Sequence, residues 1–383
     1  MINHRENIKN SKRIVFKLGT NIITNECGNI ALSRVYSLIE SIAKLKEENK
    51  EIILVTSGAV GMGAKILGNP RNHDPISLKQ ACAAVGQGRL MQFYEEALEK
   101  FNIKTAQILL TADDFSKRKK YLSVRNTLNT LLALDVIPII NENDVISTSE
   151  LECYKEDNVA VCFGDNDKLS ALVASKLDAD ILVILSDVDG LYNGNPKVEK
   201  NLKMISIVEE ITPEIESFCF SASKGGRGGM KTKIEAAKIA AHSGSMVVIA
   251  NGKDANIIKK IFNSEDVGTL FLSVEQLSGR KKWIAFATNI SSYIMVNEGA
   301  KKALIEKKAS LMPIGIIQIK NSFKKGDVIG IIDENNQEFA KGITNYSSKE
   351  CKNVIGKNSE EIEKILGFKN YDTVITRDNI VIL

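Results

Sequence analysis

A glycine-rich segment with two lysines is the part of this sequence best suited to hold an anion. Residues 225–233 read GGRGGMKTK and run into a helical pattern. Glycines let backbone N–H groups approach a ligand, and the first turn of a helix offers unpaired N–H groups with a partial positive charge. Lys231 and Lys233 add full charges, so the segment predicts phosphate binding. The alternative is a solvated loop, and the glycine patterns of P-loop and dinucleotide-binding proteins do not occur in the sequence.

Two further charged residues can be explained either by chemistry or by packing. Lys17 interrupts the apolar run Arg13–Leu18, where an unpaired ammonium group would be costly to bury. It either reaches solvent from the end of a strand or holds an oxyanion there. In the sequence GDND, Asp167 either caps the helix that follows or, together with Asp165, orders lysines around a polyphosphate. Asn166 between them offers a donor and an acceptor to a small polar substrate.

The residues that are scarce narrow the reaction. The three histidines (His4, His73 and His242) are far apart, and none belongs to a zinc motif, which argues against a zinc enzyme and a Ser-His-Asp hydrolase. An alcohol acceptor would need a general base, whereas a carboxylate is already nucleophilic at neutral pH. Catalysis then requires positioning and charge neutralisation by lysines, N–H groups and Mg²⁺. The sequence therefore favours the formation of an acyl phosphate.

These residues need a scaffold, and the first 260 residues predict an α/β fold. Short apolar runs at 13–18, 52–56, 104–109, 136–141, 181–186 and 246–250 alternate with helical patterns near 33–49, 77–101, 114–134, 167–177, 230–242 and 254–262. This alternation indicates a parallel sheet covered by helices on both faces. Polar and glycine residues follow four of the strands, at 17–20, 57–61, 141–144 and 186–187. Ligands bind at the carboxyl ends of such strands, so a site is expected along this edge.

Composition places the chain among soluble cytoplasmic proteins. Of its 383 residues, 44% are hydrophobic and 26% charged, and no apolar run is long enough to span a membrane. The first residues lack the apolar core of a signal peptide. The six cysteines form no CxxC pair, which indicates reduced thiols. We expect a cytoplasmic location and no membrane partner.

The helical periodicity stops near residues 264–279, which predicts a domain boundary. We expect a catalytic domain at 1–270, a linker at 271–279 and a compact, mostly-β module at 280–383. The module has 17 Lys and Arg against 12 Asp and Glu, a net charge of +5. RNA binding is one interpretation of that charge. A structural or regulatory appendage is favoured, because the few aromatic residues are scattered and form no stacking platform.

Seven segments, in this order, resemble the bacterial glutamate 5-kinases of the amino acid kinase family. They are VFKLGT, LVTSGAVGMG, QACAAVGQGRLM, NENDVIS, FGDNDKLSA, LSDVDGLYNGNP and GGRGGMKTKIEAA. The part from about Arg280 onward resembles a PUA domain, so the resemblance covers nearly the whole chain. It implies a three-layer αβα sandwich that uses ATP and Mg²⁺ to phosphorylate the γ-carboxylate of L-glutamate. The product would be L-glutamyl 5-phosphate, in the first step of proline biosynthesis.

The resemblance also implies roles for individual residues. Lys17 and Lys233 would stabilise the transferred phosphoryl group, and Asp167 would orient them. Glutamate would be held by Ser57, Gly58, Asn141, Asp144, Asp165 and Asn166. The nucleotide would contact Lys17, Ser186, Asp187, Arg227, Gly228, Gly229, Met230, Lys231, Thr232 and Lys233. No protein ligand to a metal is implied.

Some features depart from the family pattern or extend beyond the reaction. Ser186 replaces a common threonine, Arg227 replaces a small hydroxyl residue, and the loop at 145–163 is longer than expected. Kinases for aspartate or N-acetylglutamate are the close alternatives. The resemblance further implies feedback inhibition by proline, a homodimer or homotetramer, and transfer of the product to glutamyl-phosphate reductase.

Overall fold

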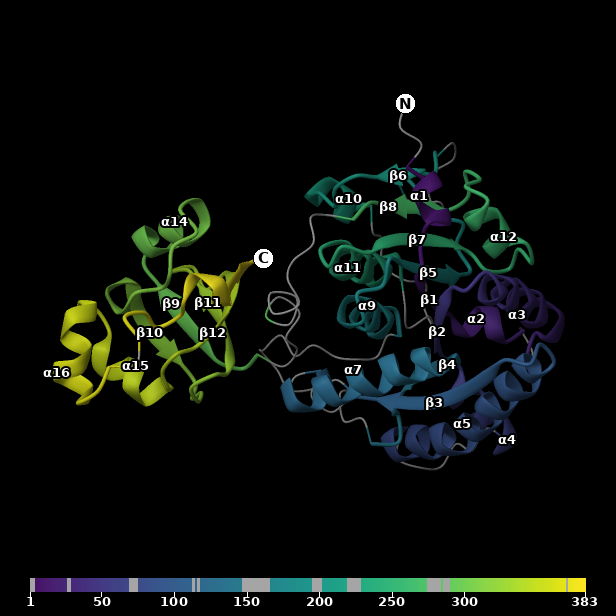
Figure 1. The fold of residues 1–383 in the computed structure, drawn as a ribbon, viewed down its shortest axis with the longest axis horizontal. Coiled ribbons are helices and arrows are strands. Elements are labelled where there is room, and N and C mark those ends of the chain that lie inside the picture. Colours follow the sequence, from purple (N-terminus) through teal and green to yellow (C-terminus); the bar gives the residue numbers. More distant parts are fainter. Residues whose placement is uncertain are drawn as a thin grey trace. The chain divides into compact units, whose positions relative to one another are not determined.

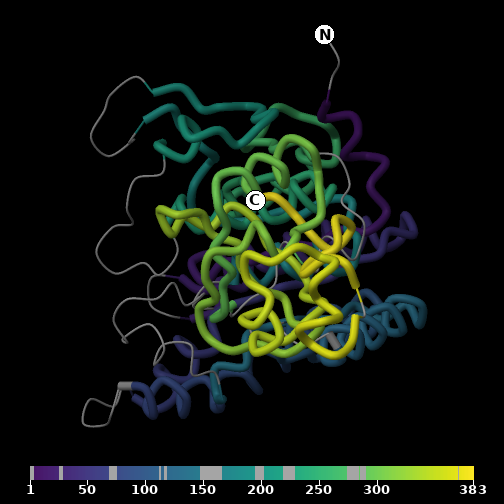
Figure 2. Tube along the Cα trace, turned by 90° about the vertical axis from the view of Figure 1, so that its left-hand side faces the viewer, coloured from purple at the N-terminus to yellow at the C-terminus, as the bar shows by residue number. Residues whose placement is uncertain are grey.

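The protein is described here by a computed structural model in which two compact units, Met1–Gln276 and Leu277–Leu383, are distinguished. The described residues are 4–25, 29–68, 75–111, 114–115, 118–146, 166–194, 202–218, 229–273, 284, 290–369 and 371–383. Figure 1 labels their helices and strands, and Figure 2 follows the Cα trace after a turn of 90°. Each unit is described by itself. None of the described helices is long and apolar enough to cross a membrane.

The first unit is built on one eight-stranded sheet. Its strands are β1 (Arg13–Leu18), β2 (Glu51–Thr56), β3 (Lys104–Leu110), β4 (Val136–Glu142), β5 (Ile181–Ser186), β6 (Ile207–Val208), β7 (Met246–Asn251) and β8 (Thr269–Phe271). They are arranged in the order β3-β4-β2-β1-β5-β7-β8-β6, and the β7–β8 pair is antiparallel. The six predicted strands are confirmed to within one residue at each end. Strands β6 and β8 were not predicted, because two or three residues are too few to show a pattern.

Helices cover both faces of this sheet. They are α1 (Glu6–Lys9), α2 (Thr20–Ile23), α3 (Leu32–Glu47), α4 (Ala59–Ile66), α5 (Pro75–Glu99), α7 (Arg118–Ala133), α9 (Asn166–Lys176), α10 (Pro213–Ser217), α11 (Met230–Ala241) and α12 (Ile257–Phe262). Helices α3, α5 and α12 share one hydrophobic core with the sheet, and α9 and α11 pack together on the opposite side (Figure 1). The predicted three-layer αβα sandwich is confirmed. Helix α4 was not predicted, because its sequence AVGMGAKI contains two glycines, which disfavour helix.

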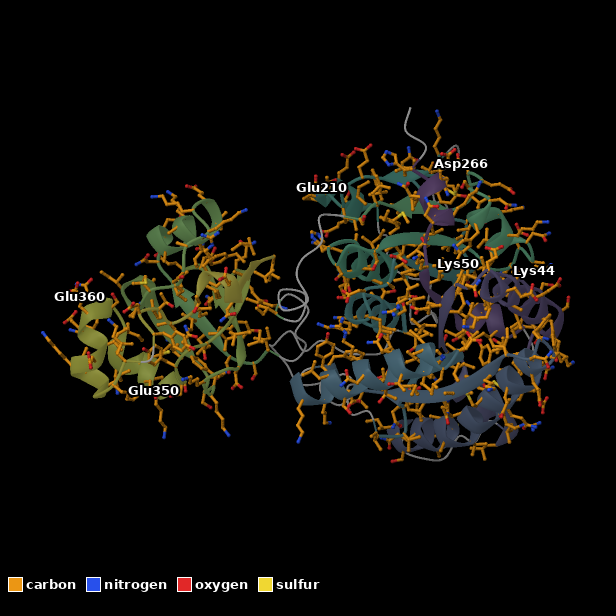
Figure 3. All side chains as sticks on the ribbon, in the orientation of Figure 1. Lys44, Lys50, Glu210, Asp266, Glu350 and Glu360 are labelled. Atoms are coloured by element: carbon orange, nitrogen blue, oxygen red, sulfur yellow. The ribbon has the colours of Figure 1, made fainter. Side chains whose placement is uncertain are left out.

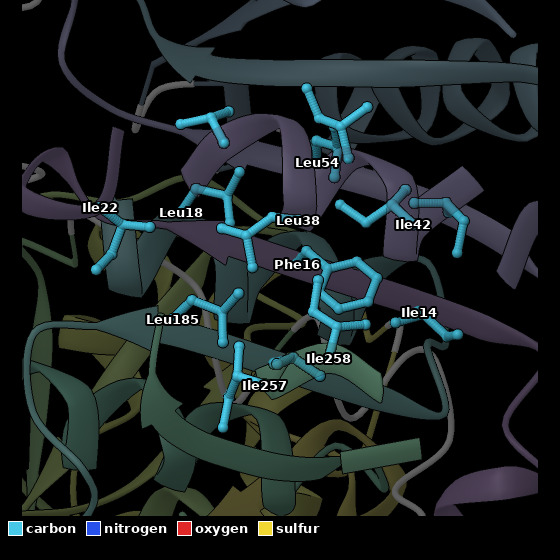
Figure 4. Packing of buried hydrophobic residues seen from close by; sticks show 14 of the residues in the cluster. Ile14, Phe16, Leu18, Ile22, Leu38, Ile42, Leu54, Leu185, Ile257 and Ile258 are labelled. Atoms are coloured by element: carbon cyan, nitrogen blue, oxygen red, sulfur yellow. The ribbon is translucent and has the colours of Figure 1, made fainter. Parts of the chain in front are cut away.

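The alternation of side chains along β1 decides which face its lysine occupies. Ile14, Phe16 and Leu18 are fully buried in the core that includes α3 and α12 (Figure 4). The Phe16 and Phe262 rings are 6.2 Å apart in this core. Successive side chains of a strand point to opposite faces, so Lys17 lies on the other face of the sheet, where α9 and α11 pack.

The second unit is a small, mostly-β module, as predicted. Its sheet has the order β10-β9-β11-β12-β13. The elements are β9 (Tyr293–Val296), α14 (Glu298–Glu306), η1 (Pro313–Gly315), β10 (Ile316–Lys320), β11 (Val328–Ile332), β12 (Glu338–Ile343), α15 (Ser348–Val354), η2 (Ser359–Glu361), α16 (Ile362–Leu366), η3 (Arg377–Asn379) and β13 (Ile380–Ile382). It has a separate hydrophobic core, which includes the fully buried Ile294, Ile331 and Val374. Helix α15 begins with a capping box formed by Ser347 and Glu350.

Candidate active site

The carboxyl ends of four neighbouring strands bring the predicted site residues to one edge of the sheet. Strands β4, β2, β1 and β5 are adjacent and parallel. Their ends carry Asn141, Ser57, Lys17 and Ser186 respectively. The chain leaves β1 on one side to form β2 and returns on the other side as β5. Sheets of this kind bind ligands where the strand order reverses in this way.

Three charged side chains from different elements form the centre of this edge. Lys17 Nζ lies 2.6 Å from Asp167 Oδ1, and Lys233 Nζ lies 3.0 Å from Asp167 Oδ2. Their exposed fractions are 6% for Lys17, 0% for Asp167 and 4% for Lys233. Thr232 Oγ1 lies 3.1 Å from Asp167 Oδ2 and 2.9 Å from the Gly229 carbonyl oxygen, and its single proton can be donated to either acceptor. We call Lys17, Asp167 and Lys233 the lysine–aspartate cluster.

The electrostatics of the cluster favour an anionic ligand. Burial raises the pKa of Asp167, but the charges and hydrogen bonds of Lys17 and Lys233 outweigh this and lower it to about 2. The carboxylate is therefore ionised at neutral pH, and two ammonium groups beside it give the cluster a formal charge of +1. A surface ion pair is different. Lys44 and Glu40 neutralise each other's charge one to one, and both side chains are exposed to solvent, into which Lys44 projects (Figure 3). Counted over these three residues, the charge suits a site that takes an anion, although the Asp187 carboxylate also lies within the influence of Lys233.

Glycine at position 19 leaves space beside Lys17. A Cβ atom there would lie 3.3 Å from the Leu185 carbonyl oxygen and 3.7 Å from Lys17 Nζ. The N–H of Gly19 donates to that same carbonyl at 3.1 Å, which holds the end of β1 against β5. A side chain here would be tight against the Leu185 carbonyl oxygen and would lie in contact with the ammonium group, so glycine leaves the space beside Lys17 free of a side chain.

The predicted glutamate-binding residues Ser57 and Gly58 form the turn between β2 and α4. Ser57 Oγ donates to the Leu18 carbonyl oxygen at 3.0 Å, which connects the ends of β2 and β1. Gly58 has φ +104°, in the left-handed region where glycine is favoured. This turn starts α4 directly beside the end of β1.

The predicted amides Asn141 and Asn166 are joined to each other. Asn166 Nδ2 donates to Asn141 Oδ1 at 3.1 Å and to the Thr56 carbonyl oxygen at 2.8 Å. Asn141 Nδ2 donates in turn to Gln87 Oε1 at 2.8 Å. Sequence reasoning missed Gln87, because a glutamine on a long amphipathic helix is typical of a solvent-facing position. The segment QACAAVGQGRLM, which carries part of the family resemblance, was the available signal.

Asp144, another predicted glutamate ligand, is paired with a lysine that the sequence did not reveal. Lys79 Nζ lies 3.5 Å from Asp144 Oδ1, and the two side chains are 15% and 17% exposed. Lys79 belongs to α5 and Asp144 follows β4. The pair adds one charge of each sign to the same edge of the sheet.

Asp187, predicted to contact the nucleotide, is held by its neighbours. Asn21 Nδ2 donates to Asp187 Oδ2 at 2.9 Å, and Ser186 Oγ donates to Asp187 Oδ1 at 3.2 Å. Burial alone would raise the pKa of Asp187. The hydrogen bonds and the charge of Lys233 have a larger effect in the opposite direction, so the pKa of Asp187 lies below its ordinary value. Sequence reasoning missed Asn21, because asparagine after a strand is ordinary in a turn.

A second acid–amide pair lies at the ends of β5 and β7. Asn251 Nδ2 donates to Asp189 Oδ1 at 2.8 Å, and neither residue was predicted to belong to the site. Asp189 is part of the segment LSDVDGLYNGNP, which was the available signal.

The glycine-rich segment is described from Gly229 onward. Gly229 precedes α11, whose first residues are Met230, Lys231, Thr232 and Lys233. Of the two lysines, Lys233 is buried in the cluster and Lys231 is exposed. The predicted residues Asp165, Arg227 and Gly228 lie outside the described residues, as does the predicted long loop beyond Ile146.

The sequence matches two family models. The model of the amino acid kinase family matches residues 12–251, and that of the PUA domain matches residues 292–366. Glutamate 5-kinase of Thermoanaerobacter sp. (strain X514) is 44% identical over 373 residues, which cover 97% of this chain and 98% of the relative. Glutamate 5-kinase of Methanosarcina acetivorans is 44% identical over 392 aligned residues, which cover 100% of this chain and 99% of the relative.

A solved structure shares the fold of the first unit. Carbamate kinase from Giardia lamblia, bound to AMP-PNP, aligns with a TM-score of 0.50 and 18% sequence identity. The alignment covers 70% of this chain and 100% of the carbamate kinase. At this identity the likeness concerns the fold alone.

Proposed function

The chain belongs to the glutamate 5-kinases of the amino acid kinase family, and from this premise we propose that it transfers the terminal phosphoryl group of ATP to the γ-carboxylate of L-glutamate. The product is L-glutamyl 5-phosphate, the first intermediate of proline biosynthesis. The observation that carries the proposal is the lysine–aspartate cluster, in which two buried lysines share one aspartate at the carboxyl edge of the sheet.

The cluster suits phosphoryl transfer because its charge is held in place before the reaction. The transferred group carries negative charge on its oxygens throughout, and fixed positive groups stabilise that charge without having to reorganise. Asp167 holds both ammonium groups in position, and the Thr232 hydroxyl lies next to it. Lys17 and Lys233 then stabilise the phosphoryl group as it passes between nucleotide and acceptor.

The other site residues divide between the two substrates. Glutamate lies against Ser57, Gly58, Asn141, Asp144, Asp165 and Asn166. ATP lies against Ser186, Asp187 and the segment of Arg227, Gly228, Gly229, Met230, Lys231, Thr232 and Lys233. The start of α11 supports this division, since its first N–H groups follow Gly229 directly and no side chain of the N-cap residue binds them.

Mg²⁺ fits this site as an ion carried by the phosphates of ATP. Among the residues that the structure describes, no group of three or more His, Cys, Asp or Glu side chains is placed to hold a metal ion. Mg²⁺ in kinases commonly keeps several waters and binds substrate phosphates together with few protein carboxylates. When bound, it would supply additional positive charge to the phosphates.

The reaction is tested by trapping the acyl phosphate with hydroxylamine. The purified protein is incubated with ATP and Mg²⁺, together with L-glutamate, L-aspartate or N-acetyl-L-glutamate. Formation of the hydroxamate with glutamate, and much less with the other two, supports the proposal. Hydroxamate formation only with aspartate or only with N-acetylglutamate would overturn the choice of substrate.

Regulation and assembly complete the proposal. Proline, which resembles a cyclised glutamate, inhibits the reaction by competing at the glutamate site. The chain acts in the cytoplasm as a homodimer or homotetramer and passes its labile product to glutamyl-phosphate reductase. The PUA unit is a structural or regulatory appendage rather than an RNA-binding module. Glutamate titrations with and without proline, light scattering, and salt-dependent RNA binding test these points one by one.

A further inference from the structure

A chain of three side-chain amides connects α5 to the start of α9. Gln87 on α5 accepts a hydrogen bond from Asn141 at the end of β4, and Asn141 accepts one from Asn166. Asn166 is the first residue of α9, directly before Asp167 of the lysine–aspartate cluster. The amide chain therefore ends beside the groups proposed to handle the phosphoryl group.

A backbone carbonyl fixes the direction of every amide in this chain. The Thr56 oxygen can only accept, so the group of Asn166 that faces it must be the NH₂ group. The same NH₂ group donates to Asn141, which must present its oxygen there and its own NH₂ group to Gln87. Gln87 completes the order by presenting Oε1. If the Gln87 acceptor is removed, the Asn141 NH₂ group loses its hydrogen bond to Gln87 Oε1, and the orientation of the Asn141 amide is no longer fixed from that end.

This order leaves one acceptor without a donor. Asn166 Oδ1 is buried and has no hydrogen-bond partner among the described residues. A buried polar atom without a partner is costly, and such atoms call for a ligand or an ordered water. A carboxylate or a phosphate cannot satisfy it, because both are acceptors. The matching ligand group is a hydrogen-bond donor, and the α-ammonium group of an amino acid supplies one.

The position of Gln87 is set by an unusually close helix contact. A Cβ atom on Gly86 would lie 1.8 Å from the Ala59 carbonyl oxygen, and one on Gly63 would lie 1.8 Å from the Cys82 carbonyl oxygen. One glycine on each helix thus allows the backbones of α4 and α5 to touch. Because α4 starts at the Ser57–Gly58 turn, this contact brings Gln87, next to Gly86, to the carboxyl ends of the strands.

We propose that Gln87 is a positioning residue, which through Asn141 holds the Asn166 carbonyl oxygen in place to accept a hydrogen bond from the α-ammonium group of the acceptor substrate. The site thereby selects dicarboxylic acids that carry a free amine over those that lack one. This inference rests on the proposed glutamate kinase activity and adds to it a residue of α5 and a basis for selectivity.

The test compares glutamate with glutarate, which has both carboxylates and lacks the amine. The ratio of kcat/KM for glutamate to that for glutarate is measured for the wild type, Gln87→Leu and Gln87→Glu. Gln87→Leu removes the acceptor and is expected to lower this ratio by about fivefold or more, the size of a direct coupling between two interacting groups. Gln87→Glu keeps an acceptor oxygen and is expected to retain most of the ratio. The loss in Gln87→Leu should appear mainly in the KM for glutamate, with the KM for ATP little changed.

Gln92→Leu is the matched control, since Gln92 lies on the same helix and is exposed. It is expected to leave the ratio unchanged. If Gln87→Leu lowers the activity with glutamate and glutarate equally, or leaves both unchanged, the inference is wrong. Failure of the proposed function itself would be visible separately, because the wild type would then form no acyl phosphate from glutamate at all.

Discussion

The two units each contain a buried aspartate paired with lysine, and the two aspartates are satisfied in different ways. Asp333 in the second unit accepts hydrogen bonds from the backbone N–H groups of Asn335 and Gln337, at 3.0 and 2.9 Å, and lies 2.8 Å from Lys301 Nζ. Two of its three partners come from its own turn. Asp167 in the first unit instead collects two lysines from β1 and α11.

We propose that this difference distinguishes Asp333, which has a structural role, from Asp167, which has a role in the reaction. The Lys301 hydrogen bond and the Gln337 backbone N–H lower the pKa of Asp333, and one lysine neutralises one carboxylate. The turn is complete without any ligand. The lysine–aspartate cluster places two lysines on one carboxylate, at the edge where sheets of this kind bind ligands. A lowered aspartate pKa is common to both regions, so the excess of lysine is the distinguishing sign.

The largest expected effect comes from removing a lysine of the cluster. Lys17→Ala or Lys233→Ala is expected to lower turnover by roughly 10²–10³, the usual loss for one preorganised electrostatic group. Lys301→Ala removes the corresponding lysine of the second unit and should leave turnover nearly unchanged. Steady-state kinetics at saturating glutamate and ATP measure all three. Near-normal turnover in both cluster variants would remove the distinction between the two regions.

Replacing Asp167 or Asp333 compares how much each aspartate contributes to the free energy of unfolding. Asp167→Asn leaves two buried ammonium groups without their shared partner, so the free energy of unfolding should fall by about 3–5 kcal/mol. In Asp333→Asn, the amide oxygen can still accept from the turn, and the loss should be clearly smaller. Urea unfolding followed by circular dichroism gives both values. Equal losses in the free energy of unfolding would show that the two aspartates contribute equally to stability, contrary to this prediction.

A pair of glycines on α5 tests how closely the scaffold holds the site. Gly86→Ala places a methyl group against the Ala59 carbonyl oxygen and should destabilise the protein by about 1–3 kcal/mol, as overpacking does. It should also raise the KM for glutamate, because it moves α5 away from the strand ends. Gly88→Ala, two residues on, meets nothing within 4 Å and should be neutral or slightly stabilising. Thermal unfolding and glutamate titrations distinguish them, and equal behaviour would refute the close contact.

Acid has a smaller and more gradual effect. Because the pKa of Asp167 is lowered to about 2 from an ordinary value of 3.8, its contribution to stability is fully present above about pH 4. It decreases as the pH falls through the folded pKa, and its full size is about 2 kcal/mol. The free energy of unfolding between pH 5 and pH 3 should therefore fall less in Asp167→Asn than in the wild type. A parallel decrease in both proteins would contradict the assigned pKa.

The sequence predicted the scaffold better than the details of the site. Continuous apolar strands and the helices between them predicted the sheet, and the polar residues after four of its strands do lie together at one edge. That this edge binds ligands stays a prediction. Lys17 stood out because it interrupts an apolar strand, and the structure buries its side chain against Asp167. Its role with an oxyanion stays a prediction. The partners Gln87, Lys79 and Asn21 were not predicted, because a polar residue on a helix or turn looks the same in sequence whether it faces solvent or a neighbouring side chain.

Helix α4 shows why some elements could not be predicted from local sequence patterns. Gly61 and Gly63 are both unfavourable in an isolated helix. Gly63 is required here, because a Cβ atom on it would lie 1.8 Å from the Cys82 carbonyl oxygen of α5. Such a requirement depends on a tertiary contact that no local pattern records. The same applies to the amide chain, whose direction is set by the Thr56 carbonyl oxygen from another element.

We propose above all that the lysine–aspartate cluster stabilises the phosphoryl group while it is transferred from ATP to glutamate. A crystal structure with Mg²⁺, a non-hydrolysable ATP analogue and L-glutamate tests it most directly. We expect the terminal phosphate of the analogue within hydrogen-bonding distance of Lys17 Nζ and Lys233 Nζ, with the γ-carboxylate of glutamate facing it. A terminal phosphate bound elsewhere, with the two lysines still paired only to Asp167, would contradict the account.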